Sequence, residues 1–308
     1  MSGCTLCPRN CGADRVKSKG YCGESTAVRV ARAALHFWEE PCISGVSGSG
    51  TVFFTGCSLK CVFCQNYALS DAGKGWTVST QKLADIFLAL QDKGASNINL
   101  VTPSHFVPQI AEALEKAKGQ GLLLPVVYNT GSYENVSTVK MMEGLADIYL
   151  PDLKFYSQEL SARYANAPDY FEKASEAIAE MVRQTGPAVF SEESILREDG
   201  EEIRLMKKGT VVRHMVLPGC TKDSKQILEY LYRTYGDGVY ISIMNQYTPM
   251  LSTGQLEGFP ELERPVTSRE YSRVVDFALK LGIENAFIQE GGTDKDSFIP
   301  SFNGDGVL

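Results

Sequence analysis

The sequence predicts an α/β protein of repeated strand–helix units, preceded by a small cysteine-rich cap. From residue 51 onward, short apolar runs alternate with helix-length amphipathic stretches, the pattern of a parallel sheet covered by helices. Residues 1–48 instead hold clustered cysteines and glycine-rich turns, without strand–helix alternation. We therefore expect a metal-binding cap (1–48), an α/β domain (49–290) and a C-terminal tail (291–308).

The expected elements follow one another in a regular rhythm. Strands are expected at 51–56, 97–102, 124–129, 147–150, 211–217 and 239–244, with a seventh candidate at 285–289. Helices are expected at about 80–93, 107–119, 134–144, 168–185, 223–235 and 268–281. Residues 187–210 break the rhythm with charged, turn-rich sequence, which indicates a surface hairpin. This number of units fits a barrel, complete or partial, or a doubly wound open sheet, and no dinucleotide-binding glycine fingerprint follows the first strand.

Composition narrows the class of protein. The 308 residues carry 30 Lys+Arg against 37 Asp+Glu, a formal net charge of -7. This balance argues against a dedicated nucleic-acid-binding protein, because phosphate neutralisation needs a basic face. The apolar runs fall short of the ~20 residues of a membrane helix, and the first residues lack a signal-peptide pattern. We expect a cytoplasmic protein with no membrane partner.

Nine cysteines are the most informative feature of the chain. In a reducing compartment, clustered cysteines are more often metal ligands or catalytic thiols than disulfides. Seven of the nine fall into two tight groups, while Cys42 and Cys220 stand apart. The first group is Cys4, Cys7, Cys11 and Cys22, and the second is Cys57, Cys61 and Cys64.

The second group follows directly on the first expected strand. Three thiolates at spacings of four and three on one loop can wrap one metal centre. Three ligands are one short of a closed site, and an open position points to chemistry there. The loop would also lie at the carboxyl end of a strand, where parallel α/β folds place their active sites. The alternative is a structural zinc loop completed by a distant ligand.

The spacing Cys57-x3-Cys61-x2-Cys64, with the aromatic Phe63 before the last cysteine, resembles the signature of the radical S-adenosylmethionine (SAM) superfamily. The resemblance implies a [4Fe-4S] cluster on these three cysteines, SAM chelating the open iron, and Phe63 beside the adenine. It also implies reductive cleavage of SAM to methionine and a 5′-deoxyadenosyl radical for hydrogen abstraction, with a reductant such as flavodoxin or ferredoxin. The implied fold is a partial (β/α)6 TIM-like barrel, which agrees with the strand count.

Polar residues at other strand ends are candidate SAM contacts. Asp152 and Lys154 lie two residues apart, so an extended backbone directs both to one face. A carboxylate beside an ammonium suits the zwitterionic amino-acid end of SAM, and the alternative is an ordinary surface ion pair. Glycyl-radical-enzyme activating enzymes carry a similar Asp-Leu-Lys, and residues 212–219 resemble their basic, apolar strand ending in Pro-Gly. Residues 240–246, which end in Gln246, resemble their last strand, which reaches the adenosine.

One segment departs from the family pattern. Radical SAM enzymes usually follow the second strand with a Gly-Gly-Glu-type segment that holds the SAM amino group, whereas this chain has residues 99–105 there. Thr102 and Ser104 offer oxygen acceptors at that position but no carboxylate. Asn99 and Asn129 interrupt apolar strands, and because buried amides need partners, a polar ligand in the barrel would supply them. All four are therefore candidates for cofactor binding.

Two histidines are candidates for acid/base chemistry or SAM contact. His105 begins a helix after a strand, a suitable place for a group that faces a ligand. His214 lies inside an expected strand, and its alternative is a core histidine with satisfied hydrogen bonds.

The first cysteine group supplies four thiolates, the complement of a closed metal site. The sequence leaves two occupants open for Cys4, Cys7, Cys11 and Cys22. A second [4Fe-4S] cluster would relay electrons or bind substrate, whereas zinc would only fold the cap.

Taken whole, the chain resembles a poorly characterised iron–sulfur branch related to pyruvate formate-lyase activating enzymes. One hypothesis that follows is an activase that installs a glycyl radical on a partner protein. A second is radical modification of a small molecule, a peptide or an RNA nucleotide, of which RNA fits the acidic charge least. A third, from another class, is a non-enzymatic electron-transfer or metal-binding protein.

Overall fold

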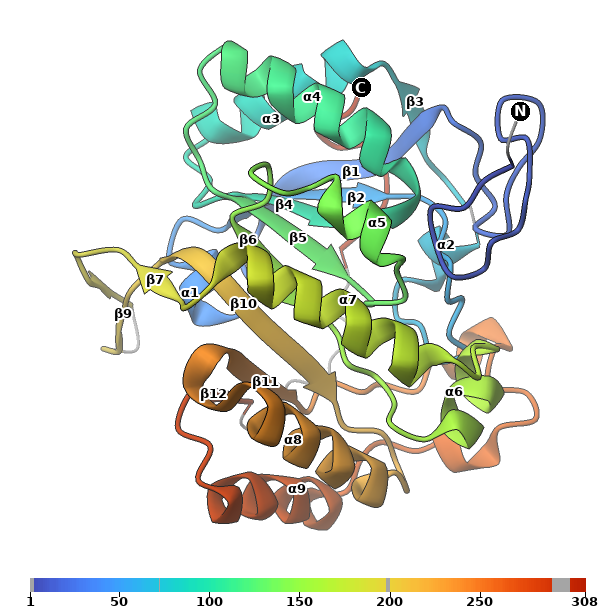
Figure 1. Ribbon diagram of the computed structural model, residues 1–308, viewed down its shortest axis with the longest axis vertical. Helices are drawn as coiled ribbons and strands as arrows, with labels where there is room; N and C mark the ends of the chain where they lie inside the picture. The colour runs from blue at the N-terminus through green and yellow to red at the C-terminus, as the bar shows by residue number, and fades with distance from the viewer. Residues whose placement is uncertain (1–2, 72, 198–199, 290–299) are drawn as a thin grey trace.

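Parallel strands occur in the sheet in the same order as in the sequence. The computed structural model describes residues 3–71, 73–197, 200–289 and 300–308 (Figure 1). Within these residues, seven strands pair in parallel, each with the next one along the chain. They are β2 (Ser49–Phe54), β4 (Ile98–Val101), β5 (Val126–Thr130), β6 (Ile148–Pro151), β10 (Met206–Met215), β11 (Tyr240–Met244) and β12 (Ala286–Ile288). The predicted α/β partial barrel is confirmed, with the seventh candidate strand at its edge.

Helices connect the parallel strands and cover the sheet (Figure 1). Those that match predicted helices are α3 (Thr80–Asp92), α4 (Val107–Gly119), α5 (Val136–Lys140), α7 (Tyr170–Thr185), α8 (Thr221–Tyr235) and α9 (Ser268–Leu281). The ends of α9 show why the sequence begins and stops a helix there. Thr267 and Glu270 form a reciprocal capping box at its start, and Gly282 adopts a left-handed conformation at its end. Two further short helices are α2 (Tyr67–Ser70) and α6 (Gln158–Ala165).

Two apolar clusters hold the helices on the sheet. One packs α3 and α4 against β2, β4 and β5, and the other packs α7, α8 and α9 against β10 and β11. Strands buried on both faces read as continuous apolar runs, as in Ile148–Pro151, where every residue is buried. The helices shield one face of these strands, and the other face points into the barrel. Among the described helices, none is both long and apolar enough to cross a membrane.

An antiparallel strand precedes the barrel, where the sequence analysis expects none. Strand β1 (Val28–His36) pairs with β2 on one side and with β3 (Trp76–Val78) on the other. The expectation that residues 1–48 contain no strand was therefore wrong. Two arginines interrupt the short alanine-rich run of β1, and ion pairs satisfy them: Arg29 with Glu24, and Arg32 with Asp305. The boundaries of the cap and the barrel remain predictions.

Residues 300–308 of the expected C-terminal tail pack against β1, while residues 291–299 lie outside the described residues. The backbone of Gly304 donates to Ala31, and that of Ala33 donates to Asp305. Val307 is buried in the apolar cluster under α3. The described part of the tail therefore covers the antiparallel side of the sheet.

A short helix, α1 (Pro41–Ser44), closes the amino end of the barrel. The side-chain amide of Asn97, just before β4, donates to the Ile43 carbonyl over 2.7 Å, and Ser96 Oγ donates to the Ser44 carbonyl over 3.1 Å. Ile43 and Cys42 pack inside the barrel against residues of β5, β6 and β10. Helix α1 therefore forms a plug at this end of the barrel. Residues 39–40, just before the plug, face the interior.

The expected surface hairpin is present among the described residues. Strands β8 (Ile195–Leu196) and β9 (Glu202–Ile203) pair antiparallel, and β7 (Val189–Phe190) pairs with the start of β10. Strand β10 therefore begins earlier than the sequence predicts.

Candidate functional site

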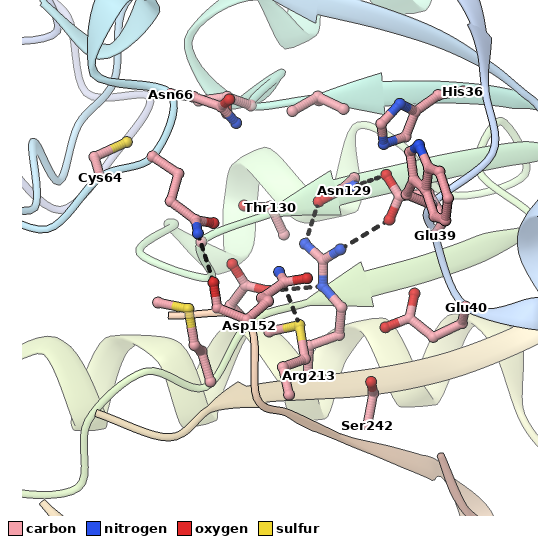
Figure 2. Close-up of a pocket in the computed structure, with 18 of the residues that line it drawn as sticks. His36, Glu39, Glu40, Cys64, Asn66, Asn129, Thr130, Asp152, Arg213 and Ser242 are labelled. Carbon is pink, nitrogen blue, oxygen red and sulfur yellow. Dashed lines mark hydrogen bonds and ion pairs between the residues drawn. The ribbon is translucent and has the colours of Figure 1, made fainter. Parts of the chain in front are cut away.

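A cavity of about 960 Å³ lies inside the barrel, lined by residues at the carboxyl ends of the parallel strands (Figure 2). Because the carboxyl ends of parallel strands meet at one edge, each strand delivers a side chain to the same space. The lining includes Cys57 after β2, Thr102 after β4, Asn129 on β5, Asp152 after β6, Arg213 on β10 and Ser242 on β11. This volume lies at the upper end of the range for ligand pockets.

The loop after β2 carries three cysteines to the wall of the cavity. Cys57, Cys61 and Cys64 all line it, and Cys61 is buried. Gly56 lets the chain turn here, since it has a φ of +81° and a Cβ would lie 2.6 Å from the Cys22 carbonyl oxygen. Lys60, between the cysteines, also has a positive φ of 53°.

Burial keeps the thiols of Cys61 and Cys64 protonated when no metal is bound. It raises the pKa of Cys61 and raises that of Cys64 to about 11, although the Lys154 ammonium opposes both shifts. Metal ligation needs the thiolate, so loading the site releases protons. In the described part of the chain, no three His, Cys, Asp or Glu side chains are arranged to hold a single metal ion. A four-iron cluster is held by thiolates that bind different irons, so three thiols on one loop fit such a cluster.

The N-terminal cysteines adjoin this loop. The Cys57 backbone N–H donates to the Cys22 carbonyl over 3.2 Å, which joins the two cysteine groups directly. Arg9 anchors the segment by donating to the Ser58 and Ala165 carbonyls, and Arg15 donates to the His105 carbonyl. Figure 1 shows the N-terminal loops on the same side of the barrel as α2.

The four thiols of this first group influence one another. Burial raises the pKa of Cys7 to about 12, and the neighbouring Cys22, Cys4 and Cys11 add to the shift. Burial also raises the pKa of Cys22. The sulfurs of Cys11 and Cys22 both lie near Gly20, at 3.4 and 3.5 Å from the place that a Cβ on this glycine would take. The chain therefore gathers these thiols in one place.

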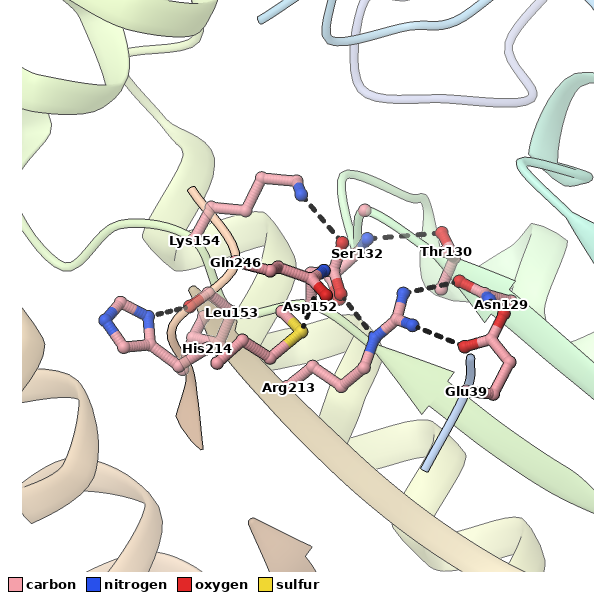
Figure 3. A network of polar contacts seen from close by, with 12 residues as sticks. Glu39, Asn129, Thr130, Ser132, Asp152, Leu153, Lys154, Arg213, His214 and Gln246 are labelled. Carbon is pink, nitrogen blue, oxygen red and sulfur yellow. Dashed lines mark hydrogen bonds and ion pairs between the residues drawn. The ribbon is translucent and has the colours of Figure 1, made fainter. Parts of the chain in front are cut away.

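A network of charged groups lines the same cavity as the cysteines (Figure 3). Asp152 accepts from Lys154 Nζ over 2.7 Å and from Arg213 Nε over 2.7 Å. Burial alone would raise the pKa of Asp152, but these two cations outweigh it and lower the pKa. Lys154 shows the complementary effect, because Asp152 raises its pKa against the opposing effect of burial. Asp152 and Lys154 thus remain ionised and face the cavity together.

Arg213 connects this pair to the opposite wall. Its remaining nitrogens donate to Glu39 Oε2 over 3.0 Å and to Asn129 Oδ1 over 2.6 Å. Glu39 also accepts from the amides of Asn99 and Asn129 through Oε1, over 3.0 and 3.2 Å. The two asparagines that interrupt apolar strands therefore have a protein partner, Glu39, for their amide groups.

Most of the residues expected to contact SAM line the cavity. Phe63, which is 4% exposed, lies among the rings of Phe155, Tyr164 and Tyr247. The predicted residues on the cavity wall are Cys57, Cys61, Phe63, Cys64, Thr102, Asn129, Asp152, Lys154 and Gln246. Asn99 and Ser104 are not among the lining residues: Asn99 lies behind the wall, bonded to Glu39, and the Ser104 hydroxyl donates to buried Glu134.

Thr102 has a backbone conformation that marks it out. Its φ is 58°, and a β-branched residue rarely adopts this left-handed region. Such strain persists where the surrounding structure fixes it, often at ligand sites. Here the Thr102 N–H donates to the Asn129 carbonyl, which fixes the turn at the wall of the cavity.

The structure places both candidate histidines away from the cavity. His105 is 2% exposed, with Nε2 bonded to the Thr55 carbonyl over 2.7 Å. Both ring nitrogens of His214 have partners, the Leu153 carbonyl and Ser224 Oγ. Neither lines the cavity, so the site does not support a role on the substrate for them. The contacts of His214 fit the alternative interpretation, a core histidine with both ring nitrogens hydrogen-bonded.

The two histidines make the stability of the metal-free protein dependent on pH. Burial lowers the pKa of each to about 4, below the value of 6.5 expected in the unfolded chain. Between pH 6.5 and pH 4 the unfolded state therefore binds protons that the folded state does not. As the pH falls from 6.5 to 4, we expect the free energy of unfolding to decrease by on the order of 3 kcal/mol per histidine.

Urea denaturation at pH 4, 5, 6 and 7 measures this dependence, with His105→Gln as the comparison. The variant should lose the contribution of one proton to the slope of stability against pH. An unchanged slope would show that His105 takes up its proton equally well in the folded state.

Sequence reasoning missed Arg213, Glu39, Glu40 and Ser242, all of which line the cavity. Arg213 had a visible signal, a charged residue inside a buried apolar strand. The two glutamates had none, because they precede the barrel and reach its interior only through the plug at α1.

Comparisons with known proteins agree with this geometry. Residues 51–231 match the profile of the radical SAM superfamily. Uncharacterized protein MJ0674 of Methanocaldococcus jannaschii is 24% identical over 292 residues, which cover 91% of this chain and 75% of that protein.

Two solved structures share the fold. The [FeFe]-hydrogenase maturase HydG from Carboxydothermus hydrogenoformans has a TM-score of 0.50 at 12% identity, over 81% of this chain and 55% of that chain. A second HydG structure has a TM-score of 0.50 at 14% identity, over 79% of this chain and 51% of that chain. This chain therefore corresponds to about half the length of these maturases, and the likeness concerns the fold.

Proposed function

Because the chain belongs to the radical SAM superfamily, we propose that it cleaves SAM with a [4Fe-4S] cluster held by Cys57, Cys61 and Cys64. The observation that carries this proposal is the meeting of these three thiols with Asp152 and Lys154 in one cavity. The chemistry that the bound group supplies in this superfamily is one-electron cleavage of SAM, which yields methionine and a 5′-deoxyadenosyl radical for hydrogen abstraction.

The charged pair is suited to the amino-acid end of SAM. An ammonium has three N–H donors, and Asp152 accepts one from Lys154, so others are available to a carboxylate. Asp152 carries the negative charge that an amino group requires, and Arg213 fixes its orientation. Phe63 supplies an apolar wall beside the cysteines. Thr102 and Gln246 supply polar atoms on other parts of the wall.

This function is tested by SAM affinity and by product formation in protein reconstituted anaerobically with iron and sulfide. With SAM and dithionite, wild-type protein should form 5′-deoxyadenosine. Asp152→Ala should weaken SAM binding by about 10- to 100-fold, because a charged hydrogen bond is lost. Equilibrium dialysis measures the affinity, with exposed Asp92→Ala as the matched control.

Two outcomes contradict the proposal. Reconstituted wild-type protein that forms no 5′-deoxyadenosine is not a SAM-cleaving enzyme. Unchanged SAM affinity in Asp152→Ala would return Asp152 and Lys154 to an ordinary ion pair.

We further propose that Cys4, Cys7, Cys11 and Cys22 hold a second metal centre, either a [4Fe-4S] cluster or zinc. Two observations support a centre beside the first one: the thiols of this group lie close together, and the Cys57 backbone N–H donates a hydrogen bond to the Cys22 carbonyl. Metal analysis distinguishes the two occupants. Two clusters would give about eight iron atoms per chain, and the alternative would give about four with one zinc.

The identity of the substrate, from which the 5′-deoxyadenosyl radical would abstract a hydrogen atom, is a finer prediction. Glycyl-radical activation of a partner protein rests on the resemblance of residues 152–154 and 212–219 to activating enzymes. A doublet in the electron paramagnetic resonance spectrum of a glycyl-radical protein incubated with this enzyme would support it. A mass change in a small molecule or peptide that depends on SAM would support the alternative.

A further inference from the structure

Glu40 is a buried carboxyl group on the floor of the cavity (Figure 2). Its exposed fraction is 8%, and among the described residues no donor reaches its Oε2 atom. The Ser242 hydroxyl on β11 lies beside it and lines the same floor. A buried polar atom without a partner is uncommon and costly in folded proteins.

The fold holds Glu40 in this position. Pro41 begins α1, whose carbonyls at Ile43 and Ser44 accept hydrogen bonds from Asn97 and Ser96 at the amino end of β4. The plug therefore fixes the backbone next to Glu40. Glu39, its neighbour, is fully engaged with Arg213, Asn99 and Asn129. Of the two adjacent glutamates, Glu40 is the one with an atom left for a ligand.

The charges around the floor favour a cation. Among the residues that the structure describes, the cavity is lined by one more carboxyl group than cations: four carboxyl groups (Glu39, Glu40, Asp152 and Glu201) against three cations (Lys154, Arg197 and Arg213). Arg213 is bonded to Asp152 and Glu39. Burial raises the pKa of Glu40, and Glu39 adds to this effect against the attraction of Arg213. A positive group placed at Glu40 would offset both the burial and the repulsion.

We propose that Glu40 and Ser242 form a subsite that binds a cationic nitrogen group, an ammonium or a guanidinium, of the substrate. The inference rests on the proposed function, because it places the substrate between this floor and a SAM molecule bound at Asp152 and Lys154. Glu40 and the Asp152–Lys154 pair line the same cavity of about 960 Å³, a volume at the upper end of the range for ligand pockets. Ammonium and guanidinium groups both donate the hydrogen bonds that a carboxylate and a hydroxyl accept.

Small probes test the subsite in the reconstituted protein with SAM bound. The cationic probes are n-butylammonium and n-propylguanidinium, and their neutral counterparts are 1-butanol and N-propylurea. Isothermal titration calorimetry should show at least one cation binding about 10- to 100-fold more tightly than its neutral counterpart. Whichever cation binds more tightly identifies the nitrogen group that the subsite prefers.

Variants locate the binding at Glu40. Glu40→Gln keeps the shape and removes the charge, so it should abolish the preference for the cation. Ser242→Ala should weaken cation binding, while the exposed Glu115→Gln should leave it unchanged. If Glu40→Gln does not fold, two measurements still test the subsite: cation binding by Ser242→Ala, and the comparison of cationic with neutral probes on the wild-type protein.

Equal binding of cation and neutral probe by the wild-type protein would overturn the subsite, and so would an unchanged preference in Glu40→Gln. Failure of the proposed function is a separate result. It would appear as absence of 5′-deoxyadenosine from wild-type protein, whatever the probes do. Formation of 5′-deoxyadenosine without cation binding would remove the subsite alone.

Discussion

Replacing any one of Cys57, Cys61 or Cys64 with alanine is expected to abolish SAM cleavage. Three thiols on one loop form an open site, and two thiolates do not retain a cluster that already lacks a fourth protein ligand. The rate of 5′-deoxyadenosine formation should fall by at least about 100-fold, since even loss of a residue that only supports a metal ligand costs 10- to 100-fold. Product formation after anaerobic reconstitution is the measurement, together with iron bound per chain.

Two control variants separate this effect from general damage to the fold. Cys220→Ser changes a half-buried thiol at the start of α8, outside both cysteine groups, and should retain full cleavage. Cys7→Ser disturbs the N-terminal cysteine group. This variant should retain part of the SAM cleavage, because that group is distinct from Cys57, Cys61 and Cys64. If a Cys61→Ala protein cleaved SAM at the wild-type rate, the cluster would have to bind elsewhere.

Replacing Arg213 with methionine is expected to lower the free energy of unfolding by about 3–5 kcal/mol. The guanidinium bonds Asp152, Glu39 and Asn129 at once, and its side chain is 13% exposed. Its removal leaves the buried Glu39 carboxylate without a cation and takes from Asp152 one of its two cations, which costs more than the ion pair itself contributes. SAM affinity should fall as well, because Asp152 loses the group that orients it. Denaturant unfolding and equilibrium dialysis provide the two measurements.

The matched control is Arg233→Met on α8. Arg233 pairs with Glu229, and the two side chains are 75% and 39% exposed. An exposed pair contributes little, so stability should hardly change. Adding Glu39→Gln to Arg213→Met should restore much of the lost stability, because Asp152 keeps Lys154 as its cation and no buried charge is then left alone. Equal losses in the two arginine variants would show that burial of the network does not matter.

The barrel could be predicted from the sequence because its signals are local. Each parallel strand is a short apolar run, and each main helix has an apolar face and end signals within a few residues, as at α9. Strand β1 was missed because its partners, β2 and β3, lie further along the chain and one of its arginines, Arg32, pairs with the distant Asp305. Such pairing cannot be seen in the segment itself.

The candidate site could be predicted in part. The cysteine spacing, Phe63 and the Asp152–Lys154 pair are visible in sequence because the residues that act together are close in the chain. The floor of the cavity is different, because Glu39 meets Arg213 across 174 positions. The histidines were misplaced for the opposite reason: residue type suggested chemistry, but their hydrogen bonds serve the core.

The agreement between strand order and sequence order has a consequence for biogenesis. A sheet in which each parallel strand pairs with the next can grow one unit at a time as the chain emerges. The cysteine loop after β2 comes early in that process, whereas Lys154 and Arg213 come after β6 and on β10. A nascent chain that has not reached Lys154 would therefore carry these thiols without the ammonium that acts on them, and one that has not reached Arg213 would also lack its guanidinium. Assembly of the metal centre belongs after this stage of synthesis, when the barrel encloses the loop.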